Sequence, residues 1–288
     1  MKFKYKYLVI VSLILGALSE NSKASDNLES IIRDMLKKDY PVSYIQGYMQ
    51  PFATAFGTVV VSGIYHRAFN KEFQHADLGV KAIRMRVPES GQYFKFENEN
   101  VPTVFGPVTQ DSSTVPGTGC HEFTIPMYQF NLGMFSGFEV MLRGSKYNVP
   151  GIGNMDFFGI GVKYGLSDMV PMTIIPLDMS VQVIYHTYSI GNWLNSGTFA
   201  MNLQTSTNLK VIPLNIYGGV GYESTSLKLS TDEISDIGSS AVGDISINGQ
   251  NKLRGTLGAG FTLWLLNIHA EYNFGIYNSA AAGAMIVF

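Results

Sequence analysis

The final stretch of the chain, Leu253–Phe288, constrains the fold more than any other part of the sequence. From Leu266 to Phe274 every second residue is apolar, and the residues between them are polar or charged. Successive side chains of a β-strand point to opposite faces, so this pattern predicts a strand with one apolar and one polar face. Leu253–Leu263 and Ala280–Phe288 alternate in the same way, which predicts three strands joined by very short connections.

The same period of two recurs through most of the chain. It predicts strands in segments 77–86, 138–143, 157–164, 177–186, 199–204 and 212–222. Phe52–His66 is a candidate for the first strand, with Gly57 and Gly63 as bend points. In 77–86 the apolar series changes face at Ile83, which we interpret as a bulge or a strand end.

The segment between Pro88 and Gly133 is the least regular, and Gly, Pro, Ser, Thr and Asn dominate residues 97–119. Membrane barrels of bacteria have even strand numbers, short periplasmic turns and long outer loops. Counting back from a periplasmic carboxyl terminus, ten strands would place this long segment on the periplasmic side. Two further strands near 91–98 and 122–132 move the loop 99–121 outside, so we expect about 12 strands, with 10 to 14 allowed.

Charged residues fall repeatedly on the face opposite the apolar series. A charge that faced lipid at the middle of a bilayer would cost about 2–4 kcal/mol, so this distribution is typical of a lipid-facing exterior and a polar interior. The predicted lumen-facing residues are Lys81, Glu139, Arg143, Lys163, Asp178, His186, Arg254, His269 and Glu271. A soluble β-sandwich also alternates, but long strands and Tyr residues near strand ends favour an all-β, antiparallel, up-and-down transmembrane β-barrel.

The amino terminus predicts export. Lys2, Lys4 and Lys6 precede an apolar run from Tyr7 to Leu18, which is shorter than the roughly 20 residues of a spanning helix. Small residues precede Ser25, so residues 1–24 have the layout of a cleaved signal peptide. Asp26–Tyr40 has helical apolar spacing and ends at Pro41. We therefore expect a signal peptide in 1–24, a helical periplasmic or plug segment in 25–50, and an outer-membrane barrel in 51–288.

The charge balance argues against nucleic acid as a partner. Without residues 1–24 the chain keeps 16 basic and 21 acidic residues, and no basic patch remains. The single Cys120 excludes an internal disulfide, and we interpret it as an ordinary loop thiol. No nucleophile elbow, phosphate loop or zinc-binding His pair is present, so we expect no catalytic residues, no metal site and no cofactor.

From Gly47 onward the chain resembles a family of outer-membrane barrels classed only as a domain of unknown function. The segments that carry the likeness are 48–51, 126–133, 138–143, 159–165, 176–181 and 270–273. More distantly, the arrangement looks like outer-membrane transporters of hydrophobic compounds, of the long-chain fatty acid type. The terminal Phe288 resembles the assembly signal of such barrels, which implies the barrel assembly machinery and outer-membrane lipid as partners.

Three functions remain open at this point. The leading hypothesis is a non-enzymatic barrel that acts as a narrow pore or as a transporter for small or hydrophobic solutes. The alternative is a plugged structural or adhesive barrel that uses loops 99–121 and 223–249 for outside contacts. A barrel enzyme is the third, and it would need His186 or His269 beside an acid at the outer mouth.

Overall fold

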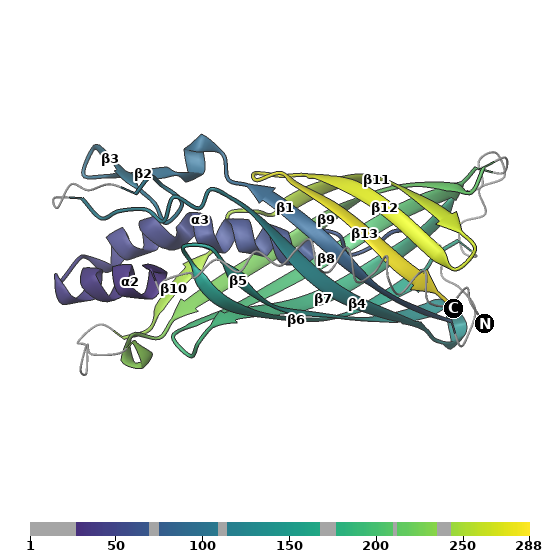
Figure 1. Cartoon of the computed structure of the whole chain (residues 1–288), viewed down its shortest axis with the longest axis horizontal. Helices are drawn as coiled ribbons and strands as arrows, with labels where there is room; N and C mark the ends of the chain where they lie inside the picture. The colour runs from purple at the N-terminus through teal and green to yellow at the C-terminus, as the bar shows by residue number, and fades with distance from the viewer. Residues whose placement is uncertain (1–26, 69–74, 109–113, 168–176, 210–211, 235–242) are drawn as a thin grey trace, which may run out of the picture.

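Ten antiparallel strands pair edge to edge into a closed ring (Figure 1). The computed structural model describes residues 27–68, 75–108, 114–167, 177–209, 212–234 and 243–288. The predicted all-β barrel is confirmed, and its ten strands lie within the expected range. Around the ring the order is β1 (Ala76–Arg86), β4 (Glu122–Gly133), β5 (Phe138–Val149), β6 (Gly153–Gly165), β7 (Asp178–Ile190), β8 (Leu194–Asn208), β9 (Leu214–Leu229), β11 (Leu253–Leu263), β12 (Leu266–Phe274) and β13 (Ser279–Val287), which pairs again with β1.

The remaining elements gather at and inside the barrel end opposite the carboxyl terminus (Figure 1). They are α2 (Asn27–Lys37), α3 (Val42–Val61), the hairpin of β2 (Tyr93–Phe96) and β3 (Glu99–Pro102), and β10 (Ile245–Asn248), which extends the sheet beyond β9. We call this the cap end, and the end where β13 finishes the C-terminal end. The cap itself consists of α2, β2, β3, β10 and the first half of α3. Neither described helix is both long enough and apolar enough to cross a membrane.

Two of the predicted strands are wrong, and the helix predicted in 26–40 is confirmed as α2. Phe52–His66 is not the first strand, because residues up to Val61 belong to α3. The strand expected near 91–98 is not part of the barrel, because β2 pairs only with β3. Without these two strands, ten of the twelve predicted strands remain. The long segment after β1 still lies at the barrel end opposite the carboxyl terminus. The signal peptide predicted in 1–24 lies outside the described residues.

Helix α3 fills the cap-end half of the lumen. Its sequence is largely apolar, apart from Gln46, Gln50, Thr54 and Thr58 at every fourth position, and nearly every residue from Tyr48 to Val61 is buried. A helix with so wide an apolar surface needs burial in a core, and the barrel wall supplies it. The chain then leaves α3 at Ser62, continues through the lumen to Ala68, and starts β1 at the C-terminal end.

The face of the barrel wall that carries polar residues differs between the two ends of the barrel. On β1 the outer face carries the exposed Leu78 near the C-terminal end, but Arg84 and Arg86 near the cap end. Pairing with β4 and β13 continues through Ile83 without interruption, so the predicted bulge or strand end is wrong. Ile83 and its inward neighbours face α3 instead of a polar lumen. The C-terminal half is therefore apolar outside and polar inside, and the cap-end half is the reverse.

Candidate functional site: the filled lumen

Eight of the nine residues predicted to line the lumen are buried in the barrel interior. Asp178 is the exception, because it lies half-buried as the first residue of β7, at the C-terminal end of the barrel. The other eight have at most 5% of their surface exposed: Lys81, Glu139, Arg143, Lys163, His186, Arg254, His269 and Glu271. They come from six different strands, so the interior of the C-terminal half is a charged network contributed by most of the wall.

The cap-end half holds an aromatic core around α3. Phe56 stacks on Phe123 of β4 with ring centroids 4.8 Å apart, and Phe52 lies 4.4 Å from Phe56 along the same helix. Tyr188 of β7 contacts both helix rings, at 5.7 and 6.2 Å. Aromatic pairs at these separations add about 0.5–1.5 kcal/mol beyond the burial of their area. The helix is therefore packed into the wall as a core element.

Two arginines of the wall bind the carbonyl groups at the end of α3. Arg143 of β5 donates from Nη1 to the oxygen of Val60 at 3.1 Å and from Nη2 to that of Ser62 at 3.0 Å. Arg254 of β11 donates to the oxygen of Val61 at 2.5 Å. The last carbonyls of a helix lack partners within the helix and carry a partial negative charge. We call these contacts the arginine clasp.

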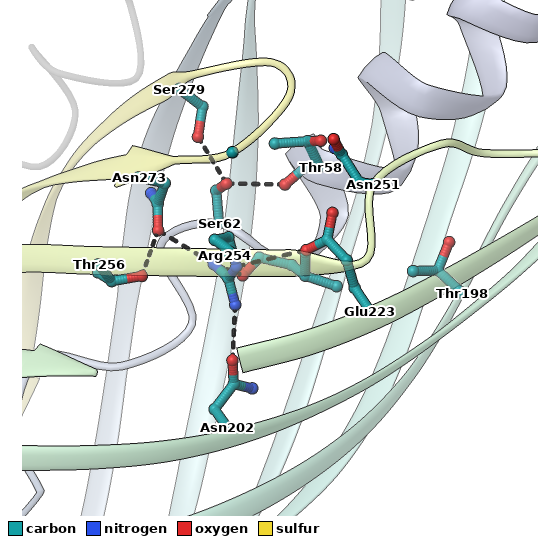
Figure 2. Close-up of polar contacts among 12 residues, drawn as sticks. Thr58, Ser62, Thr198, Asn202, Glu223, Asn251, Arg254, Thr256, Asn273 and Ser279 are labelled. Carbon is teal, nitrogen blue, oxygen red and sulfur yellow. Dashed lines mark hydrogen bonds and ion pairs between the residues drawn. The ribbon is translucent and has the colours of Figure 1, made fainter. Parts of the chain in front are cut away.

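The arginine clasp is anchored by further polar side chains (Figure 2). Arg254 also donates to Asn273 at 3.0 Å and to Asn202 at 2.7 Å, and its Nε lies 3.3 Å from Glu223 Oε2. Ser62 donates to the oxygen of Thr58 and shares a hydrogen bond with Ser279 of β13. The end of α3 is thus connected to β8, β9, β11, β12 and β13.

Glu271 of β12 binds a backbone N–H group where the chain leaves α3, whereas the two arginines bind carbonyl groups there. Its Oε1 accepts the backbone N–H of Gly63 at 2.7 Å and the side-chain amide of Asn273 at 2.9 Å. Gly63 has a φ of +64°, a left-handed conformation that a glycine adopts without a steric cost. Side chains of the wall therefore hydrogen-bond both to the carbonyl groups at the end of α3 and to the N–H of Gly63.

A second cluster lies closer to the C-terminal end and joins residues 62–68, which we call the lumen segment, to the start of β1. Arg67 Nη2 lies 2.5 Å from Asp77 Oδ2, and His75 Nε2 lies 2.9 Å from Asp77 Oδ1. On the neighbouring wall, Lys163 Nζ lies 2.9 Å from Glu139 Oε1. All of these groups are buried. Removing one partner of a buried ion pair is strongly destabilising, because the other charge would remain buried and unpaired.

The two histidines that an enzyme would need carry no carboxylate partner in the described part of the chain. His186 is fully enclosed over Gly159, where any Cβ would collide with its ring. His269 Nδ1 hydrogen-bonds to Asn267 Oδ1 at 2.8 Å. Within the described residues no group of three or more His, Cys, Asp or Glu could hold a metal ion. Sequence reasoning missed Arg67, Asp77 and Glu223. Arg67 of the lumen segment pairs with Asp77 of β1, and Glu223 of β9 meets Arg254 on the neighbouring strand β11.

The fold and its filled interior define a closed, helix-containing β-barrel. The chain belongs to the family of unknown function DUF6588, whose model matches residues 1–288. No curated protein sequence matches it.

Several solved bacterial barrels are similar to this chain at low sequence identity. The translocator domain of the autotransporter NalP from Neisseria meningitidis has a TM-score of 0.39 at 8% identity, over 85% of this chain and 96% of that chain. The outer membrane protease OmpT from Escherichia coli has 0.35 at 9% identity, over 74% and 96%. OmpT, an outer membrane protein of Vibrio cholerae, has 0.26 at 13% identity over 57% of this chain and 55% of that chain, so the chain spans about half of its length.

Proposed function

We propose that this protein is an integral outer-membrane barrel, closed by its own helix α3, that acts through the cap. The observation that carries the proposal is the packing of α3 into the lumen with its end held by the arginine clasp. A helix that shares an aromatic core with the wall closes a pore more firmly than a loop does. This favours the plugged barrel over the narrow pore or transporter that we expected first.

The membrane placement rests on the outer face of the C-terminal half. Phe158, Ile160 and Val162 of β6 are all exposed there, and Asp156 and Asn154 follow toward the cap end. Exposed apolar side chains in a continuous belt need lipid, and a closed ring leaves no sheet edge unpaired inside it. The polar outer wall beyond this belt and the cap would then stand in water. In this placement the carboxyl terminus faces the periplasm and the cap faces outside.

Phe288 supports the same placement. Its ring is largely exposed, and its backbone N–H donates to the oxygen of Ala76, the first residue of β1. The terminal residue therefore continues the lipid-facing side of β13 at the point where the ring closes. We propose that the barrel assembly machinery recognises this strand end before β1 and β13 pair.

A solute pore remains the second candidate, because the C-terminal half is lined by charged groups that would conduct if α3 moved away. A barrel enzyme is disfavoured by the lack of an acid next to His186 or His269 among the described residues. Single-channel conductance in a planar bilayer distinguishes the plugged barrel from the pore. We expect no steady conductance from folded protein, with heat-modifiable migration on a gel as the check of folding. Steady conductance would overturn the plugged barrel.

The orientation is tested by labelling intact cells. In a Cys120→Ser background, Lys37→Cys places a thiol on the exposed side of α2, and Phe135→Cys places one in the turn between β4 and β5. A membrane-impermeant maleimide should label the first and spare the second. The reverse pattern would mean that the cap faces the periplasm.

A further inference from the structure

A lysine, a glycine and a histidine lie side by side on the inner wall of the membrane-facing half. Gly283 of β13 pairs with Lys81 of β1 on one side and with His269 of β12 on the other. A Cβ at Gly283 would lie 2.8 Å from both Lys81 Cγ and His269 Nε2. The side chains of Lys81 and His269 therefore both lie over Gly283, the inward-facing residue between them, which has no side chain.

The lumen segment covers this place from inside the barrel. The ring of His66 stacks on that of His269, with centroids 5.3 Å apart and an interplanar angle of 29°. Gly63 approaches from the other side, where a Cβ would lie 3.5 Å from Lys81 Cδ. The stem of Lys81 thus lies between two glycines, next to His269 and its stacked partner His66, and the residue is 1% exposed.

The charge of Lys81 has no direct partner within the described residues, because its Nζ makes neither a hydrogen bond nor an ion pair there. The acids nearby are engaged elsewhere, since Asp77 binds Arg67 and His75, and Glu271 binds Gly63 and Asn273. Every other charged cation buried in the described lumen contacts an acid or the end of α3: Arg67, Arg143, Lys163 and Arg254. An ammonium group without a partner is costly to bury.

We propose that Lys81 Nζ holds a small anion of the halide class in the buried interior of the barrel, where the lysine stem passes Gly283 and Gly63. The ammonium has three N–H donors. His269 hydrogen-bonds through Nδ1 to Asn267 Oδ1 and does not engage Lys81 Nζ, so among the described residues all three ammonium donors are left for the ion. The nearly complete burial of Lys81 favours a monoatomic ion over a larger oxyanion. The ion neutralises the one buried cation that the protein itself does not pair.

The test uses the full chain extracted from outer membranes in detergent, with chloride or gluconate as sodium salts at equal ionic strength. Chloride should raise the unfolding midpoint of the wild type over that in gluconate, because a ligand that binds the native state stabilises it. Lys81→Met should abolish the chloride effect and should be more stable than the wild type in gluconate. Lys146→Met, an exposed lysine paired with Asp156, should keep the full chloride effect.

Equal midpoints of the wild type in the two salts, or an unchanged chloride effect in Lys81→Met, would overturn the site. If Lys81→Met fails to fold, crystals of the wild type grown in sodium bromide decide the question. An anomalous peak within hydrogen-bond distance of Lys81 Nζ supports the proposal. Density of a water at that position, without anomalous signal, refutes it.

Discussion

Arg143 and Arg254 reach the end of α3 from strands that are far apart in the ring, and they bind consecutive carbonyl groups of the same helical turn. Arg143 holds Val60 and Ser62, and Arg254 holds Val61 between them. Two positive charges at a helix carboxyl end are favourable in the helix field, and here they also fix how far the helix enters the lumen. The closed state of the barrel therefore depends on groups of the wall as much as on α3.

The arginine clasp can be tested by removing one arginine at a time. Arg143→Ala deletes two hydrogen bonds from a charged donor, each worth about 1.5–3 kcal/mol, so we expect the free energy of unfolding to fall by about 3 kcal/mol. Arg254→Ala also leaves the buried Glu223 without its cation. Urea titration of the protein in lipid vesicles measures both changes. Lys146→Ala at the exposed pair with Asp156 is the control, and it should change stability by less than about 1 kcal/mol.

The same variants should alter conductance. With both arginines replaced by Ala, the end of α3 loses its contacts with the wall, and we expect intermittent current from a barrel that is silent in the wild type. Silent double variants that still migrate as folded barrels would show that the aromatic core alone keeps the lumen closed.

The aromatic core makes a separate prediction for Phe56. Its ring is fully buried and stacks on Phe123, so Phe56→Ala should cost about 3–5 kcal/mol of the free energy of unfolding. Phe135→Ala is the matched control, because this ring is 67% exposed in a turn at the C-terminal end. Equal effects of the two substitutions in urea titration would contradict a packed helix in the lumen.

The exchange of polarity along the wall predicts where the membrane ends. Ile160→Arg places a charge on the exposed apolar belt of β6 and should cost about 2–4 kcal/mol, whereas the cost falls to about 0–1 kcal/mol near the interface. Asn154→Arg, on the same face of the same strand but near the cap end, should therefore be almost neutral. Similar costs at both positions would place the cap-end half inside the membrane.

This exchange also explains what sequence reasoning could and could not predict. Period-two alternation located the barrel strands, because it does not depend on which face is polar. The bulge assigned at Ile83 came from assuming a polar interior throughout, while the interior at that level is the core around α3. Phe52–His66 is predicted as a strand, although its residues up to Val61 are helical, because a short apolar run does not distinguish a buried helix from a strand.

The site was predictable in part for a related reason. Ionisable residues opposite an apolar series identified eight buried lumen residues, because an ionised side chain facing lipid would be costly. Their partners were not predictable, since Arg254 meets Val61 and Glu271 meets Gly63 only after the ring has closed around the lumen segment. The members of each pair lie too far apart in the sequence for a local spacing rule to connect them.

Cys120 gives a prediction for the cap end, where it lies in the segment between β3 and β4. Burial raises the pKa of its thiol to about 11, so the reactive thiolate is scarce at neutral pH. We expect slow reaction with a maleimide at pH 7.5 and a rate that keeps rising tenfold per pH unit up to about pH 10. Lys37→Cys in a Cys120→Ser background is the exposed reference, and its rate should level off near the ordinary thiol pKa of about 8.5. A Cys120 rate that levels off at the same pH as this reference would mean that the thiol is open to water, and that residues 114–121 pack against α3 more loosely than the hydrogen bond of Tyr48 to Pro116 implies.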